Sequence, residues 1–165
     1  MLGTRWGVSD AETAMKFPCD EAVPDPSWAA WRGVSVSRPP EAVWPWICQL
    51  RLAPYSYDWI DNLGRRSPRD LQGLPSPSVG ERFSRSGGRA IGRVVGVEPG
   101  VSLTATIMGV HMSYLLVPNG ASQTRLLLKI VASRRRLYDA PLVLGDLVMA
   151  RKQLLTLKRL AEALD

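Results

Sequence analysis

The chain has few of the residues that build metal sites and disulfide frameworks, with one histidine and two cysteines in 165 residues. Cys19 and Cys48 stand alone, without the paired spacing of a zinc motif or a disulfide scaffold, so we expect both thiols to be reduced. The SGG at 86–88 lacks the lysine and the following helix of a phosphate-binding loop. These absences predict a protein that holds neither a metal ion nor an organic cofactor.

Long apolar runs are also missing. No stretch approaches the roughly 18 consecutive apolar residues of a transmembrane helix. The opening residues MLGTRWGVSDAET contain no apolar segment of the kind that marks a secretory signal. We therefore expect a chain without a membrane span that resides in the cytoplasm. Its apolar content of 45% and its length of 165 residues suit a single globular domain.

Acidic residues are unevenly distributed along the chain. Residues 1–30 hold five acidic and two basic side chains, a net charge of −3, and because the whole chain carries +6 the remainder carries +9. A basic body of this kind favours contact with phosphates. Its arginines, however, fall in separate groups at 65–69, 82–93 and 134–136 and accompany no nucleic-acid-binding motif. We interpret them as solvated surface residues and do not expect nucleic acid as a partner.

Three prolines within residues 1–30 exclude a long helix or a central strand there. Trp6, Phe17 and Trp28 nevertheless supply apolar contacts. We interpret residues 1–30 as an irregular N-terminal arm and residues 31–165 as the folded domain. Two interpretations of the arm stay open: it packs against the domain, or it is a mobile tail.

Hydrophobic periodicity predicts the elements of the domain. Residues 31–38 alternate as a first strand, and Pro40 then opens a helix that Pro45 should kink or split. A second short helix is predicted over 56–64, with Ser56 as its N-cap. Five strand-like runs follow, separated by short turns, which predicts an antiparallel meander. The runs are VGERFSR, RAIGRVVGVEP, VSLTATIM, HMSYLLVP and QTRLLLKIVASRR.

The last twenty-six residues, 140–165, carry apolar positions at spacings of four and three, which predicts an amphipathic helix of about 23 residues. In the final strand, apolar and polar residues alternate, so the sheet should have one dry face and one wet face that bears Arg125, Lys129 and Ser133. The C-terminal helix is the predicted element long enough to bury the dry face. The expected class is α+β: a curved antiparallel sheet of six to seven strands wrapped around a long C-terminal helix, with two short helices after the first strand.

This order of elements resembles the helix-grip fold of the START-like, polyketide cyclase-like superfamily (SRPBCC). The motifs RPPEAVWPWICQL, YSYDWIDNLGRRS and TRLLLKI resemble landmarks of an uncharacterised bacterial branch of that superfamily. The resemblance implies a cavity between the sheet and the C-terminal helix that holds a small apolar molecule, lipid-, polyketide- or aromatic-like. The short loop LRLAP and Met112, at a position where that branch has a tryptophan, depart from the pattern, so a relative's ligand does not transfer to this chain.

The aromatic run between Trp44 and Trp59 is the candidate wall of such a cavity, where tyrosine hydroxyls could orient a ligand. The alternative is that these aromatic rings only fill the core, with Trp44 and Trp59 as its plainest members. In the second strand-like run, Ala90, Gly92, Val94 and Gly96 are expected to share one face. The residues expected to bind the ligand are Trp46, Tyr55, Tyr57, Trp59, Val94, Met112, Tyr114, Leu147, Met149 and Leu154.

The sequence favours a binding module, and an enzyme on the same scaffold (cyclase, dehydratase or hydrolase) is the alternative. Acid–base chemistry would need an ionisable group inside the cavity. Asp58 and Asp61, three positions apart on the predicted second helix, are one source of such a group, and the tyrosines are another. His111 lies at a predicted turn without a catalytic partner. No catalytic residue is assigned, and a homodimer stays open.

Overall fold

The computed structural model describes residues 4–133 and 140–163, with side chains of the last segment described from residue 148 onward. Seven strands form one sheet in the order β1-β2-β7-β6-β5-β4-β3. The strands are β1 (Arg5–Trp6), β2 (Trp28–Val36), β3 (Arg82–Ser86), β4 (Arg89–Glu98), β5 (Ser102–Ile107), β6 (Val110–Pro118) and β7 (Thr124–Ala132). The helices are α1 (Asp10–Thr13), α2 (Cys19–Ala22), α3 (Pro40–Cys48), the 3₁₀ turn η1 (Gln49–Arg51), α4 (Asp58–Asp61) and α5 (Ala140–Glu162).

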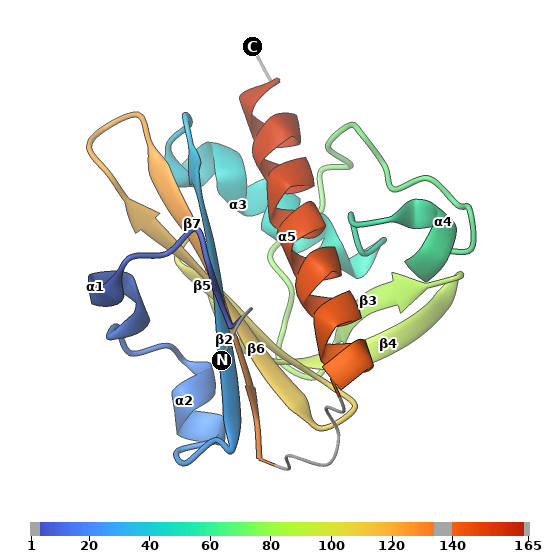
Figure 1. The fold of residues 1–165 in the computed structure, drawn as a ribbon. Helices are drawn as coiled ribbons and strands as arrows, with labels where there is room; N and C mark the ends of the chain where they lie inside the picture. Colours follow the sequence, from blue (N-terminus) through green and yellow to red (C-terminus); the bar gives the residue numbers. More distant parts are fainter. Residues whose placement is uncertain (1–3, 134–139, 164–165) are drawn as a thin grey trace.

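The strands from β3 to β7 form the predicted antiparallel meander, and β2 pairs antiparallel with β7 along its whole length. Figure 1 shows α5 crossing one face of the sheet, with α3 and α4 beside it and α1 and α2 on the opposite side. The predicted α+β architecture, a curved sheet wrapped around a long C-terminal helix, is confirmed. The strand predicted from residue 31 is β2, which begins at Trp28, three residues before the predicted start, and the two-residue strand β1 precedes it.

The inner core lies between α5 and the sheet. Leu154, Leu157 and Ala161 of α5 are fully buried, and their spacing of three and four residues places them on one side of the helix. They belong to one apolar cluster with Leu126 and Leu128 of β7. Full burial of a leucine side chain contributes roughly 1.5–3 kcal/mol, so this seam holds the helix on the sheet.

Strand β4 departs from simple alternation. Its register against β5 shifts between Val94 and Gly96, and Gly92 has a positive φ of 65°. Ile91, Val94 and Val97, three residues apart, therefore contact the inner core or its cavity. The expectation that Ala90, Gly92, Val94 and Gly96 share one face is wrong, because the bulge changes which residues point inward.

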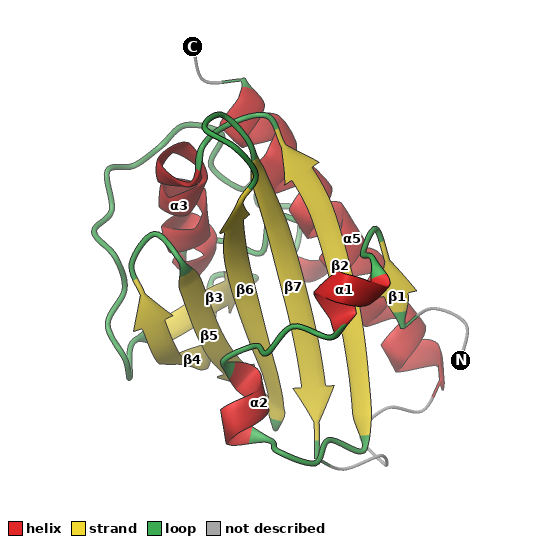
Figure 2. Cartoon of the chain, turned by 90° about the vertical axis from the view of Figure 1, so that its left-hand side faces the viewer, coloured by secondary structure: helices red, strands yellow, loops and turns green. Residues whose placement is uncertain are grey.

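The N-terminal arm packs against the outer face of the sheet, as Figure 2 shows for α1 and α2 in front of the strands. Phe17, Cys19 and Val23 form a second apolar cluster with Leu127 and Val131 of β7. The backbone N–H of Cys19 donates a hydrogen bond of 2.9 Å to the hydroxyl of Ser113 in β6. Of the two interpretations of the arm, the structure shows the packed one for residues 4–30.

The arm also supplies acidic partners to the basic residues of β7. Arg125 donates to both carboxylate oxygens of Glu12, at 2.7 and 3.0 Å, and Lys129 lies 2.5 Å from a carboxylate oxygen of Asp20. The ammonium of Lys129 also lies over the ring of Trp31, 5.1 Å from its centroid. The predicted wet face is therefore wrong at these positions, because an arm of net charge −3 covers cations of the +9 body.

The two short helices also differ from their predictions. Helix α3 continues through Pro45 to Cys48 and then tightens into η1, rather than splitting at the proline. Helix α4 has only four residues and is preceded by Tyr57, which gives no side-chain cap, rather than by Ser56. The connector after α4 is tied back to α3, because the indole N–H of Trp44 donates to the hydroxyl of Ser76 at 2.9 Å.

Replacing Glu12 with glutamine should destabilise the fold at pH 7 by about 2 kcal/mol, because Arg125 loses a charge-assisted pair whose two side chains are only 17% and 21% exposed. The hydrogen bonds from Arg125 hold the pKa of Glu12 below its usual 4.5. The ion pair therefore stabilises the fold above pH 4.5, and its contribution is lost as the pH falls through the lowered value. Urea unfolding at several pH values measures the difference between the variant and wild type.

The matched control is Asp10→Asn, which removes an arm carboxylate whose side chain is 97% exposed in its pair with Arg5. This control should change the free energy of unfolding by less than about 0.5 kcal/mol. An equal loss in the two variants would contradict the assignment of the Glu12–Arg125 pair as the main charged contact of the arm.

Both cysteines should resist thiol reagents in the native protein. Cys19 and Cys48 are free and buried, and burial raises the pKa of each thiol. Since the thiolate is the reactive form, we expect modification by a disulfide reagent to be at least about tenfold slower in buffer than in denaturant. Absorbance of the thiol released from the reagent measures both rates. Rapid modification in buffer would show that the structure around one of the two cysteines opens readily to solvent.

Candidate functional site

A cavity of about 230 Å³ lies between α5 and the inner face of the sheet. Every strand from β3 to β7 contributes to its wall, together with α5 and the loop before α4. The apolar lining residues are Pro54, Phe83, Ile91, Ile107, Met112, Leu128, Ile130, Met149 and Ala150. The polar lining residues are Ser56, Asp61, Ser84, Ser86, Tyr114 and Gln153. The site is therefore an apolar chamber with a few placed polar groups.

A short chain of hydrogen bonds links three walls of this cavity. The hydroxyl of Tyr114 in β6 donates to the side-chain carbonyl of Gln153 in α5 at 2.6 Å. The amide of Gln153 in turn donates to the backbone carbonyl of Pro54 at 2.6 Å. Because each bond joins a different pair of elements, the chain holds the sheet, α5 and the loop at fixed separations around the space.

Asp61 is the one carboxylic acid among the lining residues of this cavity. One of its oxygens accepts a hydrogen bond from the hydroxyl of Ser56, and the other is buried without a hydrogen-bond partner among the described residues. Burial raises the pKa of Asp61, against the lowering effect of the Ser56 hydroxyl. The cavity therefore contains a carboxyl group that holds its proton more tightly than a solvated aspartate does.

Three of the predicted ligand-binding residues, Met112, Tyr114 and Met149, line the cavity. Val94 and Leu154 are buried in the surrounding core and do not reach it. The side chain of Leu147 lies outside the described residues.

The aromatic run mostly fills one end of the core. Trp46 is fully buried and meets Tyr55 edge-on, with ring centroids 6.4 Å apart and planes at 81°. The hydroxyl of Tyr55 accepts a 2.6 Å hydrogen bond from the amide of Gln49, and burial raises the pKa of Tyr55 to about 12. Tyr57 is half-buried, and the ammonium of Lys152 lies 5.7 Å from its ring centroid.

The prediction that Trp59 lies in the core or in the cavity wall is wrong. Trp59 is 74% exposed and lines no described cavity, so it is neither a core residue nor part of the wall. The physical reason is the length of α4, since a four-residue helix buries no residue and leaves both Trp59 and Ile60 facing solvent.

Several lining residues were not predicted from the sequence. Gln153 and Ala150 lie on the predicted C-terminal helix, but nothing in the helical period separates residues that line a void from those that fill it. Asp61 looked like an exposed helix acid. Only the position of α4 against β3, where the hydroxyl of Ser86 donates to the backbone carbonyl of Asp61, brings it to the cavity.

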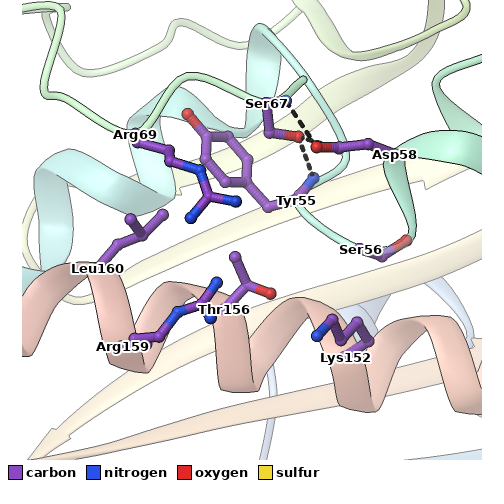
Figure 3. Close-up of a pocket in the computed structure, with 9 residues that line it drawn as sticks. All are labelled: Tyr55, Ser56, Asp58, Ser67, Arg69, Lys152, Thr156, Arg159 and Leu160. Atoms are coloured by element: carbon purple, nitrogen blue, oxygen red, sulfur yellow. Dashed lines mark hydrogen bonds between the residues drawn. The ribbon is translucent and has the colours of Figure 1, made fainter. Parts of the chain in front are cut away.

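A second pocket, of about 210 Å³, lies on the other side of Ser56, the residue that lines both cavities. Its walls are mainly polar and come from the loop that holds Tyr55 and Ser56, from the start of α4, from the connector after α4 and from the C-terminal half of α5. Figure 3 shows Arg69 extending from the connector toward Thr156 and Arg159 of α5, with Lys152 further along the helix, below Ser56. Asp58 is also present, but its carboxylate is turned toward Ser67.

His111 lies in β6 rather than in a turn and is half-buried. Its Nδ1 is buried and has no hydrogen-bond partner among the residues that the structure describes. Within residues 4–133 and 148–163, no three histidine, cysteine, aspartate or glutamate side chains are placed to hold a metal ion. In the part of the chain that the structure describes, none of the helices has the length and apolar character needed to cross a bilayer.

No protein-family model matches this sequence, and a search of curated proteins finds no match. Solved structures do match. Protein MLL2253 from Mesorhizobium loti is 21% identical with a TM-score of 0.54, and the match covers 84% of this chain and 99% of that one. The AHSA1-like protein from Aeromonas hydrophila is 18% identical with a TM-score of 0.50, over 81% of this chain and 92% of that one.

DynU16, a protein in the dynemicin biosynthetic locus, is 19% identical with a TM-score of 0.56, and the match covers 84% of this chain and 48% of that one. At these identities the likeness concerns the fold. Together with the seven-stranded curved sheet around α5, it shows that the chain has the same helix-grip fold as these proteins.

Proposed function

We propose that the protein binds a small apolar molecule, lipid-, polyketide- or aromatic-like, in the cavity between the sheet and α5. The observation that carries this proposal is the cavity itself, an apolar space in a core whose other large side chains are fully buried. Binding pockets for drug-sized ligands span roughly 300–1,000 Å³, so a cavity of about 230 Å³ suits a smaller molecule.

The lining supports recognition as well as space. Met112 and Met149 face the cavity from opposite walls, and the flexible thioether side chain adapts its shape to different apolar surfaces. Tyr114 of β6 and Gln153 of α5 place one hydroxyl and one amide side by side across the two walls, where they can orient a polar atom of the ligand. A solved neighbour from the dynemicin biosynthetic locus has the same fold, which supports a polyketide-like ligand without identifying one.

Filling the cavity should abolish binding of an uncharged fluorescent probe. Ala150→Leu places a larger side chain into the space from α5, whereas Val148→Leu places one on the exposed side of the same helix turn. With N-phenyl-1-naphthylamine as the probe, we expect at least about a tenfold loss of affinity for the first variant, since more than 1.4 kcal/mol of apolar contact is removed. The second variant should keep the wild-type affinity.

Fluorescence titration measures both affinities, and thermal unfolding confirms that each variant is folded. Absence of probe uptake by the wild-type protein would overturn the proposal. Equal affinity of the two variants for the probe would show that the probe binds at a different site, on the surface of the protein.

A second candidate function, acid–base catalysis on the same ligand, rests on Asp61. A carboxyl group inside an apolar cavity, with one buried oxygen free of hydrogen bonds and a raised pKa, has the character of a general acid or base. Tyr114 and Gln153 line the same cavity and could hold the reacting group.

The environment of Asp61 makes a pH-dependent stability test possible. Because the folded pKa is raised above 3.8, the folded state binds more protons than the unfolded chain between the two values, and stability falls as the pH rises through this window. Asp61→Asn keeps an oxygen for the Ser56 hydroxyl and cannot ionise. Its unfolding temperature relative to wild type should therefore be higher at pH 7 than at pH 3.

Differential scanning calorimetry at the two pH values measures this difference. Asp10→Asn, at a carboxylate whose side chain is 97% exposed, is the control for the loss of an acidic side chain from the chain. A relative stability of Asp61→Asn that falls between pH 3 and pH 7 would contradict a raised pKa and weaken the catalytic candidate.

A further inference from the structure

We propose that the second pocket, beside Ser56, binds a phosphate dianion, either inorganic phosphate or the phosphoryl group of a small monoester. This site is separate from the apolar cavity, and the proposal does not depend on what that cavity holds. Three cationic side chains line the pocket: Arg69 from the connector, and Lys152 and Arg159 from α5.

The spacing of residues along α5 explains why the α5 side chains of this pocket lie on the same side of the helix. Lys152, Thr156 and Arg159 stand at i, i+4 and i+7, which places them in one row along the helix surface. The connector crosses above this row and presents Arg69 from the opposite side, so the two guanidinium groups face each other across the pocket (Figure 3). Like charges arranged in this way repel each other unless an anion lies between them.

None of the three cations is paired with a carboxylate in the part of the chain that the structure describes. Six other lysine and arginine side chains in the same part each have such a partner, at 2.5–3.3 Å. Among the described residues, the one ring, ion-pair or hydrogen-bond interaction of Lys152 is with the face of Tyr57. The pocket thus places three cations that lack a carboxylate partner among the described residues around one space.

Asp58, the single acid among the residues that line the pocket, forms no ion pair with these cations. Its carboxylate accepts two hydrogen bonds from Ser67, at 2.9 Å from the backbone N–H and at 2.5 Å from the hydroxyl. This contact turns the carboxylate away from α5 and fixes the loop that leads to Arg69. Three cations and one carboxylate leave the pocket with a net charge of +2.

The chemistry of a phosphate monoester matches this arrangement. At pH 7 it carries a charge of about −1.5 to −2, which balances the net charge of the pocket, whereas a carboxylate balances about half of it. Guanidinium groups donate paired N–H bonds to phosphate oxygens, and an ammonium adds a point charge. The hydroxyl of Thr156 lies between Lys152 and Arg159 and supplies a further donor. The pocket volume of about 210 Å³ leaves room for a small group attached to the phosphate.

The test is isothermal titration calorimetry of the full chain with inorganic phosphate at pH 7.5 and low ionic strength. We expect a Kd on the order of 1 mM for this solvent-open pocket, and weaker binding as sodium chloride is added. Arg69→Gln should weaken binding at least about tenfold, because one of the facing guanidinium groups is lost. Arg66→Gln removes the same charge from the same connector, at an exposed residue outside the pocket, and should change Kd less than about twofold.

Three further ligands separate the sources of the anion. Phenyl phosphate that binds at least as tightly as inorganic phosphate would indicate a phosphomonoester ligand, and weaker binding would indicate free phosphate. Sodium acetate should bind at least about tenfold more weakly than phosphate, because it carries one charge. N-phenyl-1-naphthylamine uptake should be the same in Arg69→Gln and wild type, which separates this pocket from the apolar cavity.

Two results would overturn the proposal. One is the absence of phosphate binding by the wild-type chain up to 50-fold above the expected Kd. The other is an equal loss of affinity in Arg69→Gln and Arg66→Gln, which would mean that phosphate is attracted by the general surface charge. Arg159→Gln provides an independent check from α5, and it should reproduce the loss seen with Arg69→Gln.

Discussion

Strand β7 separates two apolar cores, and the rest of the fold depends on keeping both of its faces covered. Leu126, Leu128 and Ile130 face α5, while Leu127 and Val131 face the arm. Both faces of a strand in this position are shielded from solvent, so its basic side chains need acidic partners from outside the sheet. The arm provides them as carboxylates, and this is the physical reason why a short acidic segment precedes a strongly basic domain.

The elements with the strongest local signals could be predicted from the sequence. The meander from β3 to β7 follows from alternation and short turns, and α5 follows from a regular apolar stripe over its whole length. The docking of the arm could not be predicted, because Glu12 and Arg125 are 113 residues apart and each resembles a solvated charge on its own. The exposure of Trp59 was missed because a helix of four residues has no period from which to choose a face.

The candidate site was harder to predict than the fold. Met112, Tyr114 and Met149 could be placed at the cavity from their strand and helix positions, but the void depends on how α4 and the loop at Pro54 close its end. The same loop also separates the apolar cavity from the cationic pocket, and α5 lines both. Gln153 turns toward the apolar cavity, and its neighbour Lys152 turns toward the cationic pocket, one residue and about 100° further around α5.

The antiparallel pairing of β2 with β7 has a consequence for how the chain folds. The segments synthesised first find their partners near the end of the chain, so Trp28 pairs with Ala132 and Cys19 bonds to Ser113 only after most residues exist. Contacts of such high sequence separation carry a large loop-closure entropy and slow the folding of β-rich domains. The early acidic segment therefore docks on the sheet only after the final strand has formed.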